Sequence, residues 1–385
     1  MPRVLIVRGQ LVTPWELRPW GELPDRYDVS YLVTRSNNFD PGPLPLRAER
    51  VTALRDRLPG KVGTFVSGIA GERYLADAET AFAHADVVHA AELTFWFAAD
   101  AARRKARHGY KLVQTVYETL PLLTTFRHRY ARRYRREILA ATDLFLPATQ
   151  RAAEALELEG VPVERIVVCT PGIDVKRFRA AEAAEPREHV ILSPGRLVWE
   201  KGHHDVLRAV AWLARVGLRP RVRIVGSGPE EARLRSYADE LGIADRVQVT
   251  ALPYDEMPAA FATASCMVLA SLPLATAQRH TLDLPHAFWE EQFGMVLAEA
   301  LAAGLDIFAT GTGAIPEVLD GHGTLFAPGD WPRLARLLAE GPLARPPGTR
   351  VAASPHLVAR YSTSAMARRL TTAYDRLLSE ATPRA

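Results

Sequence analysis

Short apolar runs alternate with longer helical segments along almost the whole chain, and no other sequence feature constrains the fold as strongly. The runs are rich in β-branched residues, whereas the segments between them are rich in Ala, Leu, Arg and Glu. This alternation predicts parallel sheets flanked by helices, because parallel strands need a long crossover connection. The predicted strands lie at residues 4–7, 27–33, 61–66, 86–90, 111–117, 143–147 and 165–169, and then at 189–194, 221–226, 246–250, 266–271 and 306–310.

A polar, alanine-rich stretch at residues 179–188 separates the two series of strands, and we interpret it as a linker. The length of 385 residues exceeds one ordinary core and suits two domains. We therefore expect an α/β protein with two Rossmann-like doubly wound domains facing each other across a cleft, at residues 1–178 and 189–355. The amphipathic segment at 356–385 is predicted to be a C-terminal helix.

Composition favours a globular protein, with 48% hydrophobic and 24% charged residues. No apolar run approaches the roughly 18 residues needed to cross a bilayer, and the apolar start is a strand candidate rather than a signal peptide. The two cysteines, Cys169 and Cys266, are far apart and lack metal-ligand spacing. We expect them to be reduced core thiols of a cytoplasmic protein.

Basic residues are concentrated in two clusters, at residues 103–111 and 127–136, in a chain of net charge +4. Two interpretations stay open. The clusters are either solvated helix faces or a surface that attracts anionic lipid at the inner membrane face or an acidic acceptor. Nucleic acid is not an expected partner, because no aromatic stacking pattern accompanies the basic residues.

The segment SPGRLVWEKG (residues 193–202) directly follows a predicted strand. It places Arg196 and Lys201 in one strand-to-helix loop, where Gly195 and Gly202 permit tight turns. Ligands of open parallel sheets bind at the carboxyl ends of strands. Two cations at such a position suit a diphosphate, since Arg supplies a bidentate fork and Lys a point charge.

The segment WEEQFGMVLAEALAAG (residues 289–304) carries Glu291 and Glu299 around a predicted helix start near Phe293. The backbone N–H groups of Gly294, Met295 and Val296 would then be free to bind an anion, and the helix dipole favours one there. Glu299 is placed to bind hydroxyl groups of a sugar or ribose. Of the remaining residues, Trp289 is expected to pack beneath the loop, His286 to be structural, and His203 and His204 to be exposed.

Four segments, in their order and spacing, resemble the family-four retaining glycosyltransferases of the GT-B fold. They are SPGRLVWEKG, IVGSGPEEARLRSYADELGIADRVQV, WEEQFGMVLAEALAAG and GTGAIPEVLDGHGTLFAPGD; VERIVVCTPGIDVKRF resembles the interdomain segment of that family. The resemblance covers residues 110–335 well and the first hundred poorly. It implies transfer of a sugar from a nucleotide-diphosphate sugar to an acceptor, with retention and without metal or cofactor. It also implies that the C-terminal helix packs back on the first domain.

The resemblance implies a catalytic set of Arg196, Lys201 and Glu291, with the two cations on the diphosphate and Glu291 on the transferred sugar. It implies that the following residues bind the donor: Gly195, Gly226, Gly228, Leu252, Tyr254, Phe293, Gly294, Met295, Val296 and Glu299. The first domain departs from the family pattern. Its first loop has only Gly9 before Trp15, and Tyr117 and Glu118 stand where a histidine is usual, which makes both candidates for a contact with acceptor or sugar.

Other functions remain as alternatives. A GT-B-fold sugar-nucleotide epimerase or phosphorylase is the nearest enzyme, although no cofactor-lysine motif of a phosphorylase is visible. A non-catalytic, membrane-associated partner subunit is the alternative outside the enzymes. A dinucleotide-dependent dehydrogenase is disfavoured, because the GSGP segment at residues 226–229 lacks a third glycine at the required spacing.

Overall fold

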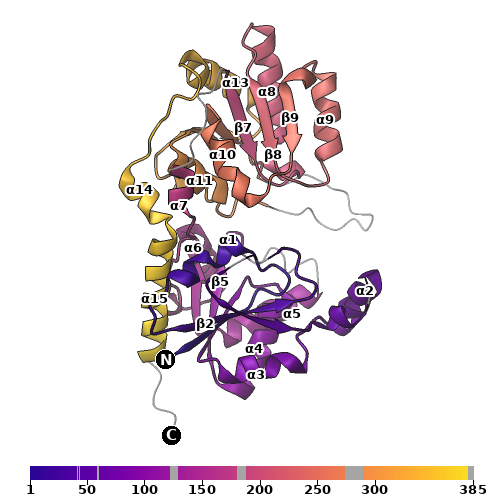
Figure 1. Cartoon of the computed structure of the whole chain (residues 1–385), viewed down its shortest axis with the longest axis vertical. Helices are drawn as coiled ribbons and strands as arrows, with labels where there is room; N and C mark the ends of the chain where they lie inside the picture. Colours follow the sequence, from indigo (N-terminus) through magenta and orange to yellow (C-terminus); the bar gives the residue numbers. More distant parts are fainter. Residues whose placement is uncertain are drawn as a thin grey trace. The chain divides into compact units, whose positions relative to one another are not determined.

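A computed structural model describes residues 1–40, 42, 44–58, 60–121, 129–179, 188–273 and 289–379. The chain forms two compact units (Figure 1). The first contains Met1–Gly172 and the chain from Thr363 onward, and the second contains Ile173–Ser362. Each unit is built on a six-stranded sheet in which all paired strands are parallel. The predicted α/β class with two doubly wound domains is therefore confirmed.

The sheet of the first unit has the order β3-β2-β1-β4-β5-β6. Its direction of winding reverses between β1 and β4, so the carboxyl ends of β1, β4 and β5 are neighbours at the switch point. The strands are β1 (Arg3–Ile6), β2 (Asp28–Thr34), β3 (Arg47–Val51), β4 (Val87–Ala91), β5 (Lys111–Val116) and β6 (Leu144–Pro147). The helices are α1 (Pro14–Leu17), α2 (Gly60–Ala70), α3 (Glu79–His84), α4 (Trp96–His108), α5 (Arg129–Ala141), α6 (Gln150–Leu158) and α15 (Thr363–Ser379), with the 3₁₀ turn η1 (Arg18–Glu22).

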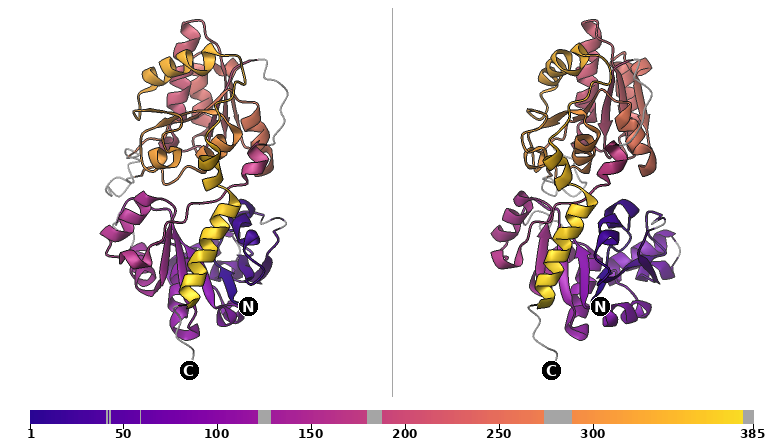
Figure 2. Two further views of the ribbon diagram at one scale, coloured as in Figure 1. Left: turned by 90° about the vertical axis from the view of Figure 1, so that its left-hand side faces the viewer. Right: turned by 60° about the vertical axis from the view of Figure 1, so that its left-hand side comes forward.

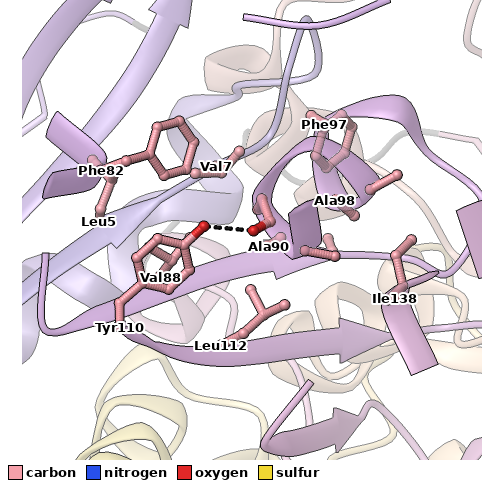
Figure 3. Close-up of a cluster of buried hydrophobic side chains, with 14 of the residues drawn as sticks. Leu5, Val7, Phe82, Val88, Ala90, Phe97, Ala98, Tyr110, Leu112 and Ile138 are labelled. Atoms are coloured by element: carbon pink, nitrogen blue, oxygen red, sulfur yellow. Dashed lines mark hydrogen bonds between the residues drawn. The ribbon is translucent and has the colours of Figure 1, made fainter. Parts of the chain in front are cut away.

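Successive side chains of the central strands enter two different cores, as the alternation of a β-strand requires. Leu5 and Val88 belong to the core that α3 and α4 cover, where Phe82 and Phe97 pack (Figure 3). The hydroxyl of Tyr110 in this core donates to the carbonyl of Ala101 at 2.5 Å. Burial on both faces explains why these strands are continuous apolar runs in the sequence.

The C-terminal helix α15 covers the opposite face of the same sheet (Figure 2). Its Tyr374 hydroxyl accepts from Trp20 Nε1 at 2.9 Å and lies 2.6 Å from His89 Nδ1. The other ring nitrogen, Nε2, lies 2.8 Å from Thr115 Oγ1, so both nitrogens of His89 have a hydroxyl partner. Burial lowers the pKa of His89 well below its ordinary value, which keeps the imidazole neutral.

The sheet of the second unit has the order β12-β11-β10-β7-β8-β9, which repeats the pattern of the first. Its strands are β7 (Val190–Pro194), β8 (Arg221–Val225), β9 (Val247–Thr250), β10 (Cys266–Leu269), β11 (Asp306–Thr310) and β12 (Thr324–Phe326). Its helices are α7 (Val175–Arg179), α8 (His203–Arg215), α9 (Glu231–Glu240), α10 (Met257–Ala262), α11 (Met295–Ala303), α12 (Ile315–Leu319), α13 (Trp331–Glu340) and α14 (Pro355–Arg360). The switch point lies between β10 and β7, so ligand-binding loops are expected after these strands.

Two strand predictions are wrong, and two edge strands have no predicted counterpart. Residues 61–66 lie inside helix α2, and residues 165–169 form no strand, although Ile166 makes an isolated bridge with Phe145. The strands without a prediction are β3 and β12. Val62 and Phe65 are three residues apart, a helical spacing that a short apolar run does not distinguish from a strand. β3 is an edge strand that buries little, and its polar sequence RAERV therefore gives no hydrophobic signal.

The division of the chain differs in detail from the predicted boundaries. Along the chain, the first unit ends at Gly172 and the second begins at Ile173, so α7 belongs to the second unit rather than to the first. Of the predicted linker at 179–188, residues 180–187 lie outside the described residues. The predicted C-terminal helix is two helices, α14 in the second unit and α15 in the first. None of the described helices combines the length and the apolar character needed to span a bilayer.

Candidate functional site

The loop between β7 and α8 is held against β10 by a glycine. Gly202 has φ of +65°, and a Cβ at this position would lie 1.9 Å from the carbonyl oxygen of Ala270. Only glycine allows this approach, which places Lys201 beside the carboxyl end of β10. The loop is also tied to the β8–α9 loop, since the Leu197 amide donates to the Ser227 carbonyl at 2.9 Å.

His203 and His204 are buried, contrary to the prediction that they are exposed. His203 Nε2 donates to the carbonyl of Arg196 at 3.1 Å, so its Nδ1 accepts from Ser193 Oγ at 2.8 Å. Burial lowers the pKa of His203 to about 4, and the neutral ring fixes the loop. His204 stacks on Trp199 with ring centroids 4.0 Å apart. The sequence gives no sign of this positioning role, because the burial of the first turn of α8 depends on the surrounding fold.

Lys201 and Glu291, predicted to be catalytic, are in contact. Lys201 Nζ lies 2.6 Å from Glu291 Oε2, and the same oxygen accepts from Ser271 Oγ at 2.8 Å. Both side chains are largely buried, with 12% and 7% of their area exposed. The ammonium also lies 5.0 Å from the ring centroid of Trp289, which supports the predicted packing of Trp289.

Arg196 extends into solvent, with 65% of its side chain exposed. Its carboxylate neighbour, Glu200, is 3.9 Å away, a distance at which an exposed pair contributes little. The guanidinium is therefore available for a ligand anion at the rim of the loop that carries Lys201.

The N-terminus of α11 begins two residues after the buried Phe293. Gly294 caps the helix with φ of +76°, and a Cβ there would lie 3.0 Å from Leu297 Cδ1. Met295 and Val296 are the first two helical residues, and their N–H groups belong to those without an intrahelical acceptor. These amides and the helix dipole form a site suited to an anion.

Glu299 and Tyr254, both predicted to contact the donor, are joined by a hydrogen bond. Burial raises the pKa of Glu299 to about 7, and the bond from Tyr254 opposes that rise. Leu252 lies in the same loop after β9 and is half-buried. The pair thus offers a carboxyl group that titrates near neutral pH.

Gly226 and Gly228 have a packing role in the structure. A Cβ on Gly226 would lie 1.9 Å from the carbonyl oxygen of Gly195, and one on Gly228 would lie 2.4 Å from that of Leu197. The two glycines therefore let the loops after β7 and β8 touch. Their predicted contact with the nucleotide stays a prediction.

Gly313 and Ser271 are site residues that the sequence analysis missed. Gly313 has φ of +57°, and a Cβ there would lie 2.2 Å from the carbonyl oxygen of Glu291. The same carbonyl accepts from the amide of Ala314 at 2.8 Å. Ser271 is the last residue of the predicted strand at 266–271, and this position at the carboxyl end of a strand was the available signal.

In the first unit, Glu118 is paired with Arg135, whose Nη1 lies 2.8 Å from Glu118 Oε2. Arg135 also binds Glu159, and all three side chains are almost fully buried. Tyr117 donates its backbone amide to Glu92 Oε1 at 3.1 Å. The structure thus adds Glu92 to the predicted pair Tyr117 and Glu118, whose contact with substrate stays a prediction.

Two family models match this chain. The family described as Glycosyltransferase Family 4 matches residues 21–177, and that described as Glycosyl transferases group 1 matches residues 174–341. The first match includes most of the first hundred residues, in which the sequence motifs resemble the family poorly. Together the two matches extend over both units.

Curated relatives match about half of the chain. WcaL of Escherichia coli, whose name links it to colanic acid biosynthesis as a glycosyltransferase, is 31% identical over 201 residues, with 51% of this chain and 47% of the relative covered. The D-inositol 3-phosphate glycosyltransferase of Streptomyces bingchenggensis is 30% identical over 217 residues, with 51% and 44% covered. The chain thus spans about half the length of the curated relatives it matches.

Solved structures match over the whole chain. Anabaena HepE in complex with UDP and glucose has a TM-score of 0.72 at 18% identity, covering 98% of this chain and 100% of HepE. The sucrose-phosphate synthase of Thermosynechococcus elongatus has a TM-score of 0.66 at 17% identity, covering 99% and 100%. These similarities establish the fold. The two family models, which together match residues 21–341, show that the chain belongs with the family-four-like glycosyltransferases of the GT-B fold.

Proposed function

We propose that the protein transfers a sugar from a nucleotide-diphosphate sugar to an acceptor, with retention of anomeric configuration and without a metal ion. The observation that carries this proposal is the contact between Lys201 and Glu291 beside the N-terminus of α11. A cation, a carboxylate and free amides at one sheet edge match the charges of a sugar diphosphate.

Each group has a distinct task in this proposal. Lys201, the exposed Arg196 and the amides of Met295 and Val296 bind the diphosphate. Glu291 accepts hydrogen bonds from sugar hydroxyl groups, and Ser271 holds its carboxylate in place. Glu299 binds the ribose of the nucleotide, and the loop with Leu252 and Tyr254 faces the base.

The chemistry follows from where charge develops. The bond between the anomeric carbon and the β-phosphate oxygen breaks, and its electron pair leaves with the diphosphate. The acceptor oxygen forms a bond to the same face of the anomeric carbon, and its proton passes to the leaving phosphate. Fixed cations and amides next to the phosphate lower the barrier, because they stabilise the growing negative charge without reorganising.

A donor screen tests the proposal. Uridine, guanosine and adenosine diphosphates and their sugars are added to the protein, and the midpoint of thermal unfolding is measured. A ligand present at 100 times its Kd adds about 3 kcal/mol of stability. Donor turnover in the presence of EDTA then tests metal independence. The anomeric proton signal of the product, axial or equatorial, tests retention of configuration. Transfer with inverted configuration, or turnover that requires a metal, contradicts the corresponding part.

We also propose that the two basic clusters contact an anionic membrane surface. Ion pairs reduce the number of basic side chains that are available for this contact. Arg103 pairs with Glu137 and Lys105 with Asp143, so part of the first cluster is neutralised. In the second cluster, residues 127 and 128 lie outside the described residues, whereas Arg132 and Arg136 are exposed. Sedimentation with phosphatidylserine vesicles that weakens at high salt supports the contact. No binding at low salt contradicts it.

A further inference from the structure

Unpaired polar atoms gather at one place in the described part of the first unit. The buried side-chain nitrogens and oxygens that have no hydrogen-bond partner there lie on β5 or in the loops after β1 and β5. They are Arg8 Nη2, Gln10 Nε2, Thr13 Oγ1, Gln114 Oε1 and Thr119 Oγ1. Buried polar groups are nearly always paired, so this set calls for polar partners, either ordered water or the polar groups of a ligand.

Glu92 lies at the same edge of the sheet, formed by the carboxyl ends of β1, β4 and β5, and its backbone is strained. It follows β4 with φ of +63°, the left-handed region that a side chain rarely adopts. Its amide donates to the Thr115 carbonyl at 2.8 Å, and its own carbonyl accepts from Gln114 Nε2 at 2.5 Å. Its Oε1 accepts from the amide of Tyr117. Contacts from β5 therefore hold both the backbone and the carboxyl in place.

The charges of this edge are already balanced. Arg8 Nε pairs with Glu16 at 2.7 Å, and its Nη1 donates to the carbonyls of Val7 and His89. Arg135 is shared by Glu118 and Glu159. Burial raises the pKa of Glu92 to about 8, with a further rise from Glu118 and Glu16 and an opposing effect of Arg8. Glu92 therefore carries a proton at pH 7, and the two cations described here, Arg8 and Arg135, already face carboxylates.

We propose that Arg8, Gln10, Glu92 and Thr119 bind hydroxyl groups of the acceptor, and that the acceptor end bound there is a neutral saccharide or polyol. Hydroxyl groups both donate and accept, which matches a set containing the amide nitrogen of Gln10, the guanidinium nitrogen of Arg8 and the hydroxyl of Thr119. A phosphorylated end would place two negative charges beside Glu118 and Glu16. In the described part of this site, the cations that could meet those charges are already paired with carboxylates. The inference rests on the proposed function, since it deepens the acceptor side of the same reaction.

The first test compares acceptor probes of one shape and different charge. The protein turns over the nucleotide sugar that stabilises it most, and nucleoside diphosphate release is measured with methyl α-D-glucopyranoside and myo-inositol, and with glucose 6-phosphate and myo-inositol 1-phosphate. We expect a neutral probe to stimulate release, with kcat/KM at least about tenfold above that of its phosphorylated counterpart, the effect of roughly one lost charge-assisted contact. A preference for the phosphorylated probes overturns the proposal, as does donor hydrolysis that no neutral probe stimulates.

The second test uses two substitutions of Glu92. Glu92→Gln keeps a donor and an acceptor in place, so the KM for the neutral probe should stay within about threefold at pH 7. In the wild-type protein that KM should rise above pH 8 as Glu92 ionises, whereas in the variant it should not. Glu92→Leu should raise the KM about tenfold or more, with kcat changed far less and donor Kd unchanged.

Control measurements separate the two proposals. Glu157→Gln, on the exposed face of α6, should change neither KM nor the pH profile. Absence of any donor binding by the wild-type protein contradicts the proposed function itself. Normal donor binding with the same acceptor KM and pH profile in wild type, Glu92→Gln and Glu92→Leu overturns only the acceptor inference.

Discussion

Lys201 Nζ and Ser271 Oγ meet on the same carboxylate oxygen of Glu291, at 2.6 and 2.8 Å. The two donors come from the loops after β7 and β10, the strands between which the sheet order reverses. The carboxylate is therefore fixed in orientation before any ligand binds, and this preorganisation avoids a cost at the moment of reaction.

Replacing Lys201 by alanine removes a cation placed for the leaving diphosphate. We expect Lys201→Ala to lower kcat about a hundredfold, because losing one such stabilising contact costs roughly 3 kcal/mol in the transition state. Steady-state donor turnover measures the effect. Lys176→Ala, on the exposed side of α7, is the matched control and should leave the rate unchanged. Equal rates for both variants would remove Lys201 from the mechanism.

Gly313→Ala should displace Glu291. Its new Cβ would lie 2.2 Å from the backbone oxygen of Glu291, and φ is +57°. We expect a loss of about 2–4 kcal/mol in unfolding free energy and a large loss of turnover in the folded fraction. Gly217→Ala has similar backbone strain, with φ of +88°, but nothing within 4 Å of the added atom. A Gly217→Ala variant as damaged as Gly313→Ala would show that strain alone, and not the clash, is responsible.

Glu299 should make stability depend on pH. Burial raises its pKa to about 7 in the folded protein from 4.5. The folded state therefore binds more protons than the unfolded state between these values, and the stability contributed below pH 4.5 is lost as pH rises through 7. The upper limit is of order 3 kcal/mol. Urea unfolding at pH 5 and pH 8 should show a smaller decline for Glu299→Gln than for wild type; parallel declines would contradict the assignment.

Tyr374→Phe should loosen the C-terminal helix. It leaves Trp20 Nε1 without its acceptor and His89 Nδ1 without its hydrogen-bond partner, both in the core. We expect a loss of about 2–4 kcal/mol in unfolding free energy, since each buried unpaired group costs about 1–3 kcal/mol. Tyr110→Phe removes the bond to one backbone carbonyl and should cost less. Hydrogen exchange should locate the Tyr374→Phe change in α15, and unaltered exchange there would contradict the role.

The sequence predicts the parts of this protein whose signals are local. Apolar runs buried on both faces, such as those around Val88 and Val268, are visible without a structure. The segment with Arg196 and Lys201 is equally visible. It follows a predicted parallel strand, and its two cations indicate an anion site at that position. These signals locate both sheets and the donor side of the candidate site.

Other features depend on which segments meet in space. The polar edge strand β3 pairs with β2 through its backbone, so its side chains carry no signal. His203 is polar and sits at a helix start, yet Ser193 and the Arg196 carbonyl bury it. The unusual backbone of Glu92 is set by β5, which lies about twenty residues further on. No local pattern in the sequence contains these three relationships.

The most direct measurement is a crystal structure of the protein with a bound nucleoside diphosphate. We expect the β-phosphate within hydrogen-bond distance of Lys201 Nζ or the Val296 amide, and the ribose hydroxyls at Glu299. A nucleotide bound away from the β7–α8 loop and the start of α11 would contradict this expectation.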